Sequence, residues 1–352
     1  MAAHFAPEII RWQVCHGRHA LPWQGTQDPY RIWLSEVMLQ QTQVSTVRAY
    51  YLKFIARFPD VHALSDAEED DVLGLWSGLG YYSRARNLHR CARLVVRGHG
   101  GRFPETAIEL QTLPGIGRST AAAIAAFCFN ERVAIFDANV KRVLSRLLAF
   151  SGDLSMKASE DQLWNHATAL LPASTHPHAM SRYTQGVMDL GATVCTARRP
   201  ACVVCPVRQL CVASSEGAPE IYPVKTRKVK RGTQKLSLLW MEIDDGRLWL
   251  EKRPSSGIWG GLHCFPTFEN DDDLQVSFPR GLRPLLRRLP GFVHILTHKT
   301  LQISAWRVVL SDTTEISKVP KYLGTSGAWH VRGEWIKLGL PAPIRKLLEG
   351  AR

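Results

Sequence analysis

The first part of the chain carries a helical pattern of apolar positions. Over residues 29–130, apolar side chains recur three and four positions apart and are interrupted by short Gly and Pro breaks. This pattern predicts about six helices. Two more helical stretches cover residues 138–150 and 181–192. We therefore expect an all-α N-terminal domain over residues 1–215.

The pattern changes after the last of four clustered cysteines. Residues 216–234 contain few large apolar side chains, and six Lys or Arg lie between Lys225 and Lys235. This composition predicts an exposed basic linker between two domains. A nuclear-localisation signal is an alternative interpretation of the same basic residues.

Strand patterns appear beyond the linker. Residues 235–243 and 247–253 favour strands joined by an Asp-Asp-Gly turn, and residues 301–310 favour another strand. The predicted fold is therefore multidomain, with the all-α domain followed by an α+β domain over residues 235–352.

The charge of the chain points to a polyanionic partner. Its 352 residues include 44 Lys and Arg against 31 Asp and Glu, a formal net charge of +13. Nucleic acid is favoured over an anionic membrane surface, because no apolar run approaches the roughly 20 residues that span a bilayer. The N-terminus lacks the pattern of a secretion signal. We expect a cytoplasmic protein without disulfides.

Four cysteines lie close together in a Cys-x6-Cys-x2-Cys-x5-Cys pattern, whereas the other four are scattered. Four thiolates in one short loop bind either zinc or an iron-sulfur cluster, and the spacing leaves both open. Four unrelated buried cysteines would be unusual at this density. The residues are Cys195, Cys202, Cys205 and Cys211.

A glycine-containing turn joins two helical stretches at residues 113–120, Leu-Pro-Gly-Ile-Gly-Arg-Ser-Thr. Gly115 and Gly117 permit a close turn that exposes amide groups at a helix N-terminus, where a DNA phosphate can bind. A plain connection between two helices is the alternative for a Gly-x-Gly sequence alone.

Two carboxylates stand in contrasting sequence contexts. Glu36 lies in a helical stretch with apolar neighbours one turn before and after it, where desolvation would raise its pKa and suit a general acid. A Glu at a solvated helix edge is the alternative. Asp137 precedes a helical stretch and fits an N-cap, which is compatible with an ionised carboxylate facing a cationic transition state. Cleavage of an N-glycosidic bond needs such a pair.

These motifs together resemble the helix-hairpin-helix DNA glycosylases of the endonuclease III and MutY group. The resemblance implies a 4Fe-4S cluster at the four cysteines and a phosphate-binding hairpin, with a monovalent cation as a possible bridge. Six motifs in order match the MutY branch, the adenine glycosylases that excise adenine opposite 8-oxoguanine or guanine. They are SEVMLQQTQV, LWSGLGYYSRARNLH, LPGIGRSTA, DANVKRVL, MDLGA and the cysteine loop, spanning roughly residues 20–211.

The resemblance implies roles for individual residues. Glu36 would protonate the adenine, and Asp137 would stabilise the cationic sugar, with Asn139 and Ser119 nearby. A second set is expected to touch DNA: Trp23 and Asp189 at the extruded adenine, and Gln41 and Tyr81 in the duplex beside 8-oxoguanine. Core packing is the alternative for Trp23 and Tyr81.

The residue type at position 119 distinguishes two classes of enzyme in this family. Family members with lyase activity carry a Lys two residues after the second hairpin glycine, as an amine nucleophile. Ser119 here predicts a monofunctional glycosylase, and an endonuclease III-like glycosylase-lyase is the alternative. A non-catalytic DNA-binding protein is a third reading, against which both carboxylates argue. Ala138 departs from the family, which usually has Gly after the catalytic Asp.

The C-terminal domain resembles a Nudix fold at residues 252–262 but lacks the glutamate-rich helix of Nudix hydrolases. By resemblance it recognises 8-oxoguanine, with Thr297 and His298 in the corresponding loop. The alternative is that His294 and His298 are two histidines of an ordinary loop beside a strand, without a role in recognition. The expected partner is double-stranded DNA with an adenine mispair, bound by a monomer that is associated with the nucleoid in a bacterium.

Overall fold

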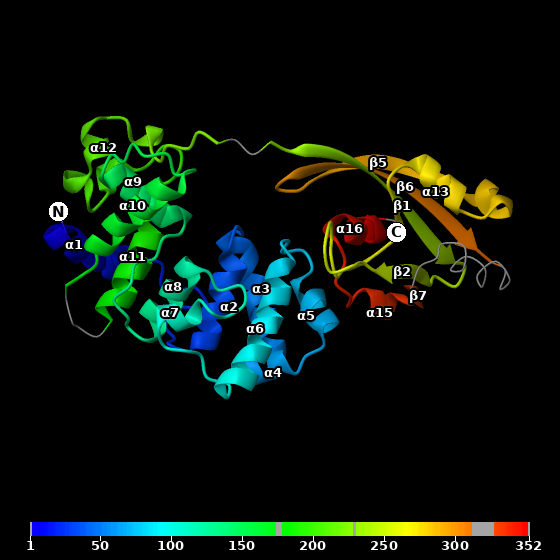
Figure 1. Cartoon of the computed structure of the whole chain (residues 1–352), viewed down its shortest axis with the longest axis horizontal. Coiled ribbons are helices and arrows are strands. Elements are labelled where there is room, and N and C mark those ends of the chain that lie inside the picture. The colour runs from blue at the N-terminus through cyan, green and yellow to red at the C-terminus, as the bar shows by residue number, and fades with distance from the viewer. Residues whose placement is uncertain (1, 174–177, 228–229, 312–326, 351–352) are drawn as a thin grey trace. The chain divides into compact units, whose positions relative to one another are not determined.

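The computed structural model describes residues 2–173, 178–227, 230–311 and 327–350. The chain forms two compact units, and Figure 1 shows the helices and the sheet that build them. The first unit comprises residues 1–66 and 87–228, and the second comprises residues 67–86 and 229–352. Lys228 and Val229 of the expected linker lie outside the described residues.

The first unit is helical. Its helices are α1 (Ala2–His16), α2 (Pro29–Leu39), α3 (Val44–Arg57), α4 (Val61–Ser65), most of α6 (Ser83–His99), α7 (Ala107–Leu110), α8 (Arg118–Cys128), α9 (Ala138–Leu147), α10 (Lys157–Ala169), α11 (Ala179–Thr193) and α12 (Val212–Ser215). Short 3-10 turns cover Cys202–Val204, Arg208–Leu210 and Pro219–Ile221. The predicted all-α domain is confirmed, while α1 and α10 were not predicted.

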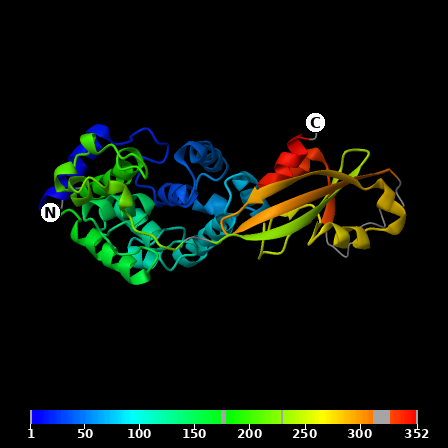
Figure 2. The same ribbon diagram turned by 90° about the horizontal axis from the view of Figure 1, so that it is seen from above.

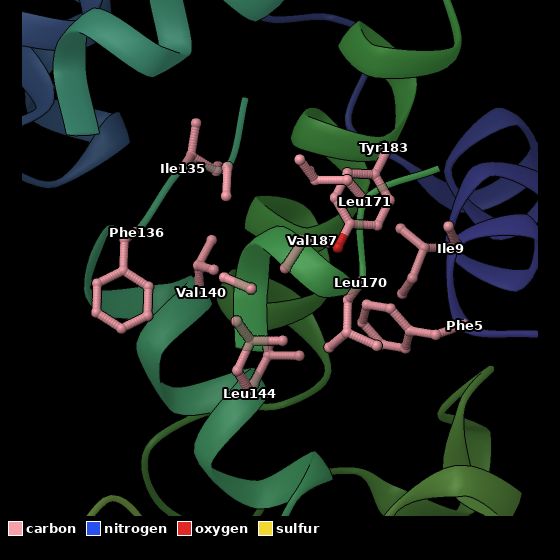
Figure 3. Close-up of a cluster of buried hydrophobic side chains, with 14 of the residues drawn as sticks. Phe5, Ile9, Ile135, Phe136, Val140, Leu144, Leu170, Leu171, Tyr183 and Val187 are labelled. Atoms are coloured by element: carbon pink, nitrogen blue, oxygen red, sulfur yellow. The ribbon is translucent and has the colours of Figure 1, made fainter. Parts of the chain in front are cut away.

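The core of this unit gathers apolar faces from helices that are distant in sequence. Phe5 and Ile9 of α1 pack with Tyr183 and Val187 of α11 and with Leu144 of α9 (Figure 3). The rings of Phe5 and Tyr183 meet edge to face at 6.1 Å between centroids. In α11, Gly186 lies so close to Ile9 that a Cβ would approach its side chain to 2.7 Å. This close packing fixes the position of α11 against α1. It therefore restricts the movement of the residues that α11 carries.

The second unit is built on a seven-stranded sheet, with five strands in the order β3-β2-β1-β6-β5. The strands are β1 (Gly232–Ile243), β2 (Leu248–Lys252), β3 (His263–Cys264), β4 (Thr267–Phe268), β5 (Arg287–Ile295), β6 (Lys299–Leu310) and β7 (Gly327–His330). The predicted strands correspond to β1, β2 and β6. The long strands β1 and β6 run parallel and in register from Gly232↔Lys299 to Ile243↔Leu310, side by side in Figures 1 and 2.

Helices complete this α+β unit: α5 (Glu69–Trp76), α13 (Asp271–Ser277), α15 (Arg332–Trp335) and α16 (Ala342–Gly350), with a 3-10 turn at Arg280–Leu285. Helix α5 packs onto the segment before α16. A Cβ at Gly74 would lie 1.9 Å from the carbonyl oxygen of Lys337, so no larger residue fits. The Ser77 and Tyr82 hydroxyls each donate to the Leu340 carbonyl at 3.0 Å.

None of the described helices is both long and apolar enough to cross a membrane.

Candidate active site

A cavity of about 680 Å³ opens beside Glu36 in the first unit. Glu36 belongs to α2, which begins at Pro29 because Asp28 caps it by accepting the Tyr30 amide at 2.9 Å. The other walls come from the segment Arg18–Gln27 and from α11. Glu36 therefore lies in the wall of a cavity.

The surroundings of Glu36 favour its protonated form. Burial raises its pKa to about 8, and the nearby charge of Asp137 adds to the effect. A carboxyl group that keeps its proton at neutral pH can donate it to a leaving base. This direction is the same as the one that the apolar neighbours of Glu36 predict.

Asp137 is the N-cap of α9. One carboxylate oxygen accepts the Val140 amide at 2.7 Å, and the other accepts the Asn139 side-chain amide at 3.2 Å. Burial raises its pKa, while these hydrogen bonds and Arg142 act in the opposite direction. These hydrogen bonds stabilise the ionised form of Asp137.

Ser119 and Asn139 hold the segment around Asp137. The Phe136 amide donates to the Ser119 hydroxyl at 3.0 Å, which ties the segment before Asp137 to the start of α8. Asn139 also accepts from the Arg142 guanidinium at 2.8 Å. A Cβ at Gly191 would lie 2.7 Å from the Asn139 Cβ, so the glycine of the MDLGA motif lets α11 approach α9.

Arg142 and Arg146 join α9 to the cysteine loop, and sequence reasoning missed both. Arg142 donates to the Cys195 carbonyl at 2.7 Å and to the Gly191 carbonyl at 2.5 Å. Arg146 is almost fully buried and donates to the Thr196 carbonyl at 2.6 Å. Their spacing of four residues on one helix face was the available signal.

Asp189 is fully buried beneath the cavity wall. Its carboxylate accepts the Arg18 backbone amide at 3.0 Å, the Arg18 Nε at 2.7 Å and the Gln185 side-chain amide at 3.0 Å. Arg18 and Gln185 both line the cavity. Asp189 therefore orients two hydrogen-bond donors at the cavity.

Trp23 lies in the cavity wall and also packs in the core. It lines the cavity, and it is buried with its ring edge to face against Tyr51 at 5.4 Å. Packing against Tyr51 fixes the ring that forms part of the wall.

The two expected wedge residues share an unusual backbone conformation. Gln41 has φ +58° and Tyr81 has φ +49°, although neither is glycine. Both are exposed, Tyr81 with 44% of its surface accessible. Strained backbone with an exposed side chain is typical of residues held ready for a ligand.

Thr297 and His298 form the turn between β5 and β6. Within the second unit, the hydroxyls of Thr297 and Tyr81 lie 3.1 Å apart and share a hydrogen bond. The His298 carbonyl accepts the Gly232 amide at 3.1 Å. The structure thus brings Thr297 beside Tyr81.

The hairpin has the expected backbone requirements. Gly115 has φ +79°, and a Cβ there would lie 2.7 Å from the Asn87 Cβ. Gly117 is the N-cap of α8, with open space around it. Arg118 follows and stacks on Trp164 at 3.9 Å. The Arg118 guanidinium also forms an ion pair with Asp161 at 3.9 Å. The amides that begin α8 are therefore the donors that could bind a phosphate.

The four clustered cysteines line one small cavity with Arg146 and Arg208. Among the residues that the structure describes, no three His, Cys, Asp or Glu side chains are arranged so that they could hold a metal ion. Burial and the neighbouring thiols raise the pKa of Cys205 to about 11, so four thiolates require a cationic core. The four thiols provide the number and the kind of ligand that an iron-sulfur cluster takes.

Three family models match the chain. Residues 34–168 match the HhH-GPD superfamily of base excision DNA repair proteins, residues 195–211 match the iron-sulfur binding domain of endonuclease III, and residues 238–350 match the NUDIX domain. The chain therefore has a helix-hairpin-helix domain with an iron-sulfur loop, followed by a Nudix domain.

Relatives and a solved structure agree with these matches. The chain is 36% identical to the adenine DNA glycosylase of Buchnera aphidicola (subspecies Acyrthosiphon pisum), over 98% of this chain and 97% of that protein. It is 34% identical to the human adenine DNA glycosylase, over 90% of this chain and 69% of that protein. A thermostable thymine-DNA glycosylase structure matches with a TM-score of 0.53 and 27% identity, covering 61% of this chain and 97% of that one. With both domains, the iron-sulfur loop and 36% identity to a relative that it covers over 97% of its length, the chain belongs to the adenine DNA glycosylases, the MutY family.

Proposed function

We propose that this adenine DNA glycosylase removes adenine opposite 8-oxoguanine or guanine, as a monofunctional enzyme of base excision repair. The observation that carries the reaction is the Glu36 carboxyl group in the cavity wall, with the Asp137 carboxylate near enough to raise its pKa. Burial and Asp137 keep Glu36 protonated up to about pH 8, while Asp137 receives two hydrogen bonds to its ionised form. One group can donate a proton while the other stabilises positive charge.

The extruded adenine occupies the cavity in this proposal. Glu36 protonates the base, which makes it a better leaving group, and Asp137 stabilises the oxocarbenium-like sugar that remains. Asn139 and Ser119 position Asp137. Asp189 contributes through Arg18 and Gln185, which line the cavity and can donate to acceptors on the base.

The second domain reads the opposite base in this proposal. From the catalytic domain, Gln41 and Tyr81 enter the duplex beside 8-oxoguanine. Thr297 and His298 contact 8-oxoguanine from the β5–β6 turn. The hydrogen bond between Tyr81 and Thr297 supports a joint role for these two residues.

The domain assignment follows from these roles. We assign residues 1–215 to catalysis, 216–234 to the linker and 235–352 to recognition of the opposite base. The hairpin at Gly115 and Gly117 binds a backbone phosphate, with a monovalent cation as a further ligand. A monomer acting on the nucleoid DNA of the cytoplasm completes the proposal.

The decisive experiment measures base release from three duplexes that differ only in the partner of one adenine. Single-turnover excision should be fast opposite 8-oxoguanine, slower opposite guanine and undetectable opposite thymine. Equal rates on all three would refute the opposite-base specificity, and no release from any would refute the glycosylase assignment. Strand cleavage should need added alkali, because Ser119 offers no amine nucleophile.

A further inference from the structure

The loop between Cys195 and Cys202 presents two adjacent arginines. Arg198 and Arg199 are both exposed, and no carboxylate of the described residues forms an ion pair with either guanidinium. Two unpaired cations on one turn suit phosphate groups of a DNA backbone. The turn that carries them is held in shape by residues outside it.

Arg146 and Thr196 fix one side of the turn. The Arg146 guanidinium donates to the carbonyls of Thr196 and Ala197 at 2.6 and 3.0 Å. The Thr196 hydroxyl donates to the Arg198 carbonyl at 3.0 Å. The hydrogen bonds from Arg146 therefore connect the carbonyl groups of the turn to α9.

Glu220 fixes the other side. Its carboxylate accepts the Arg199 backbone amide at 2.6 Å, across 21 residues of sequence. Arg199 has φ +47°, a conformation that residues other than glycine rarely adopt and that needs support from its surroundings. A charged acceptor on the Arg199 amide supplies this support.

Apart from this hydrogen bond, a negative charge at Glu220 is not expected next to arginines that bind phosphate. A carboxylate beside a phosphate-binding turn repels DNA, so its charge alone would weaken binding. We propose that Glu220 is a positioning residue for DNA binding, which holds the Arg199 backbone so that Arg198 and Arg199 face the phosphates. The proposal rests on the duplex binding of the proposed function.

The test compares binding of an undamaged duplex, on which no base is released, by the full chain with its cluster loaded. Glu220→Ala should weaken binding by about fivefold and lower the slope of log Kd against log salt by about one, as for one lost phosphate contact. Glu220→Gln keeps an acceptor oxygen and should bind as the wild type does, or more tightly. Cluster absorbance checks that each variant is intact.

Glu216→Ala is the matched control. Glu216 lies in the same exposed segment and accepts from the Tyr222 hydroxyl at 3.3 Å instead of from the loop. Removal of its charge should leave binding unchanged or tighter. Should Glu220→Ala lose the cluster, Glu220→Asp replaces it, since the shorter side chain keeps the charge but falls short of the Arg199 amide.

Unchanged or tighter binding by Glu220→Ala, with an unchanged salt slope, would overturn the proposal. So would a Glu220→Gln variant that binds as weakly as Glu220→Ala. Wild-type binding and excision are measured alongside, so a failure of the proposed function would be recognised separately: the wild type itself would then fail to bind the duplex or release adenine.

Discussion

Arg18 and Asp189 form a double hydrogen bond across 171 residues of sequence, through the backbone amide and the Nε of Arg18. The carboxylate is fully buried, while 29% of the Arg18 side chain is accessible. This pair connects the segment before α2 to α11, and both contribute residues to the cavity that Glu36 lines. Its geometry sets the shape of the space where the base is expected to bind.

Asp189→Asn should therefore weaken both folding and excision. Loss of the charge leaves Arg18 with a poorer partner, and we expect a decrease of about 1–3 kcal/mol in the free energy of unfolding. Denaturant unfolding and single-turnover excision measure the two effects. Asp245→Asn is the control, because the exposed Asp245–Arg247 pair should contribute at most about 1 kcal/mol. Equal effects of the two substitutions would contradict the role of the buried pair.

Glu36→Gln should abolish adenine excision and preserve duplex binding. The amide has nearly the same shape but cannot give a proton to the leaving base. In the wild type, excision should fall as pH rises above about 8, because the acid is then deprotonated. A pH series of single-turnover rates checks this. A turnover rate within a few fold of the wild type in Glu36→Gln would remove Glu36 as the acid.

The same pKa shift predicts a pH-dependent stability difference. Between pH 4.5, the ordinary pKa of Glu, and about 8, the folded state holds a proton that the unfolded state has released. Wild-type stability therefore falls relative to Glu36→Gln as pH rises, by at most about 1.4 kcal/mol per pH unit, and the difference levels off above pH 8. Parallel stability curves for the two proteins over this range would show that the shift is absent.

Substitution by alanine should destabilise the protein at Gly115 but not at Gly117. Gly115→Ala places a Cβ against Asn87 in a left-handed conformation, and we expect a loss of about 1–3 kcal/mol in stability together with weaker DNA binding. Gly117→Ala meets open space at an ordinary φ of −83° and should fold normally. Thermal unfolding distinguishes the two. A stable Gly115→Ala protein would indicate that the hairpin adapts.

Loss of one cluster ligand should affect folding and DNA binding together. The cysteine loop is tied to α9 by Arg142 and Arg146, so Cys202→Ala should remove cluster absorbance, lower stability and weaken duplex affinity. Cys15→Ala is the control, because Cys15 is exposed on α1. Wild-type affinity in a cluster-free Cys202→Ala protein would argue against a structural role of the cluster in binding.

Local features could be predicted from the sequence because they depend on residues that lie close together in the chain. The helical and strand patterns, the cysteine quartet, the hairpin glycines and the capping position of Asp137 all have short-range signatures. Even Glu36 was identifiable, since its apolar neighbours lie one turn away on the same helix. Helices α1 and α10 were missed, although α1 supplies Phe5 and Ile9 to the core.

Tertiary structure decided the relationships between distant segments. Whether Asp189 meets a base or orients Arg18 depends on how α11 packs against α1, and no local pattern encodes that contact. The parallel pairing of β1 with β6 and the support of Arg199 by Glu220 are likewise long-range. Side-chain types and local propensities specify the elements and candidate groups. Burial and hydrogen-bond partners, which exist only once those elements pack, decide the protonation and orientation of each group.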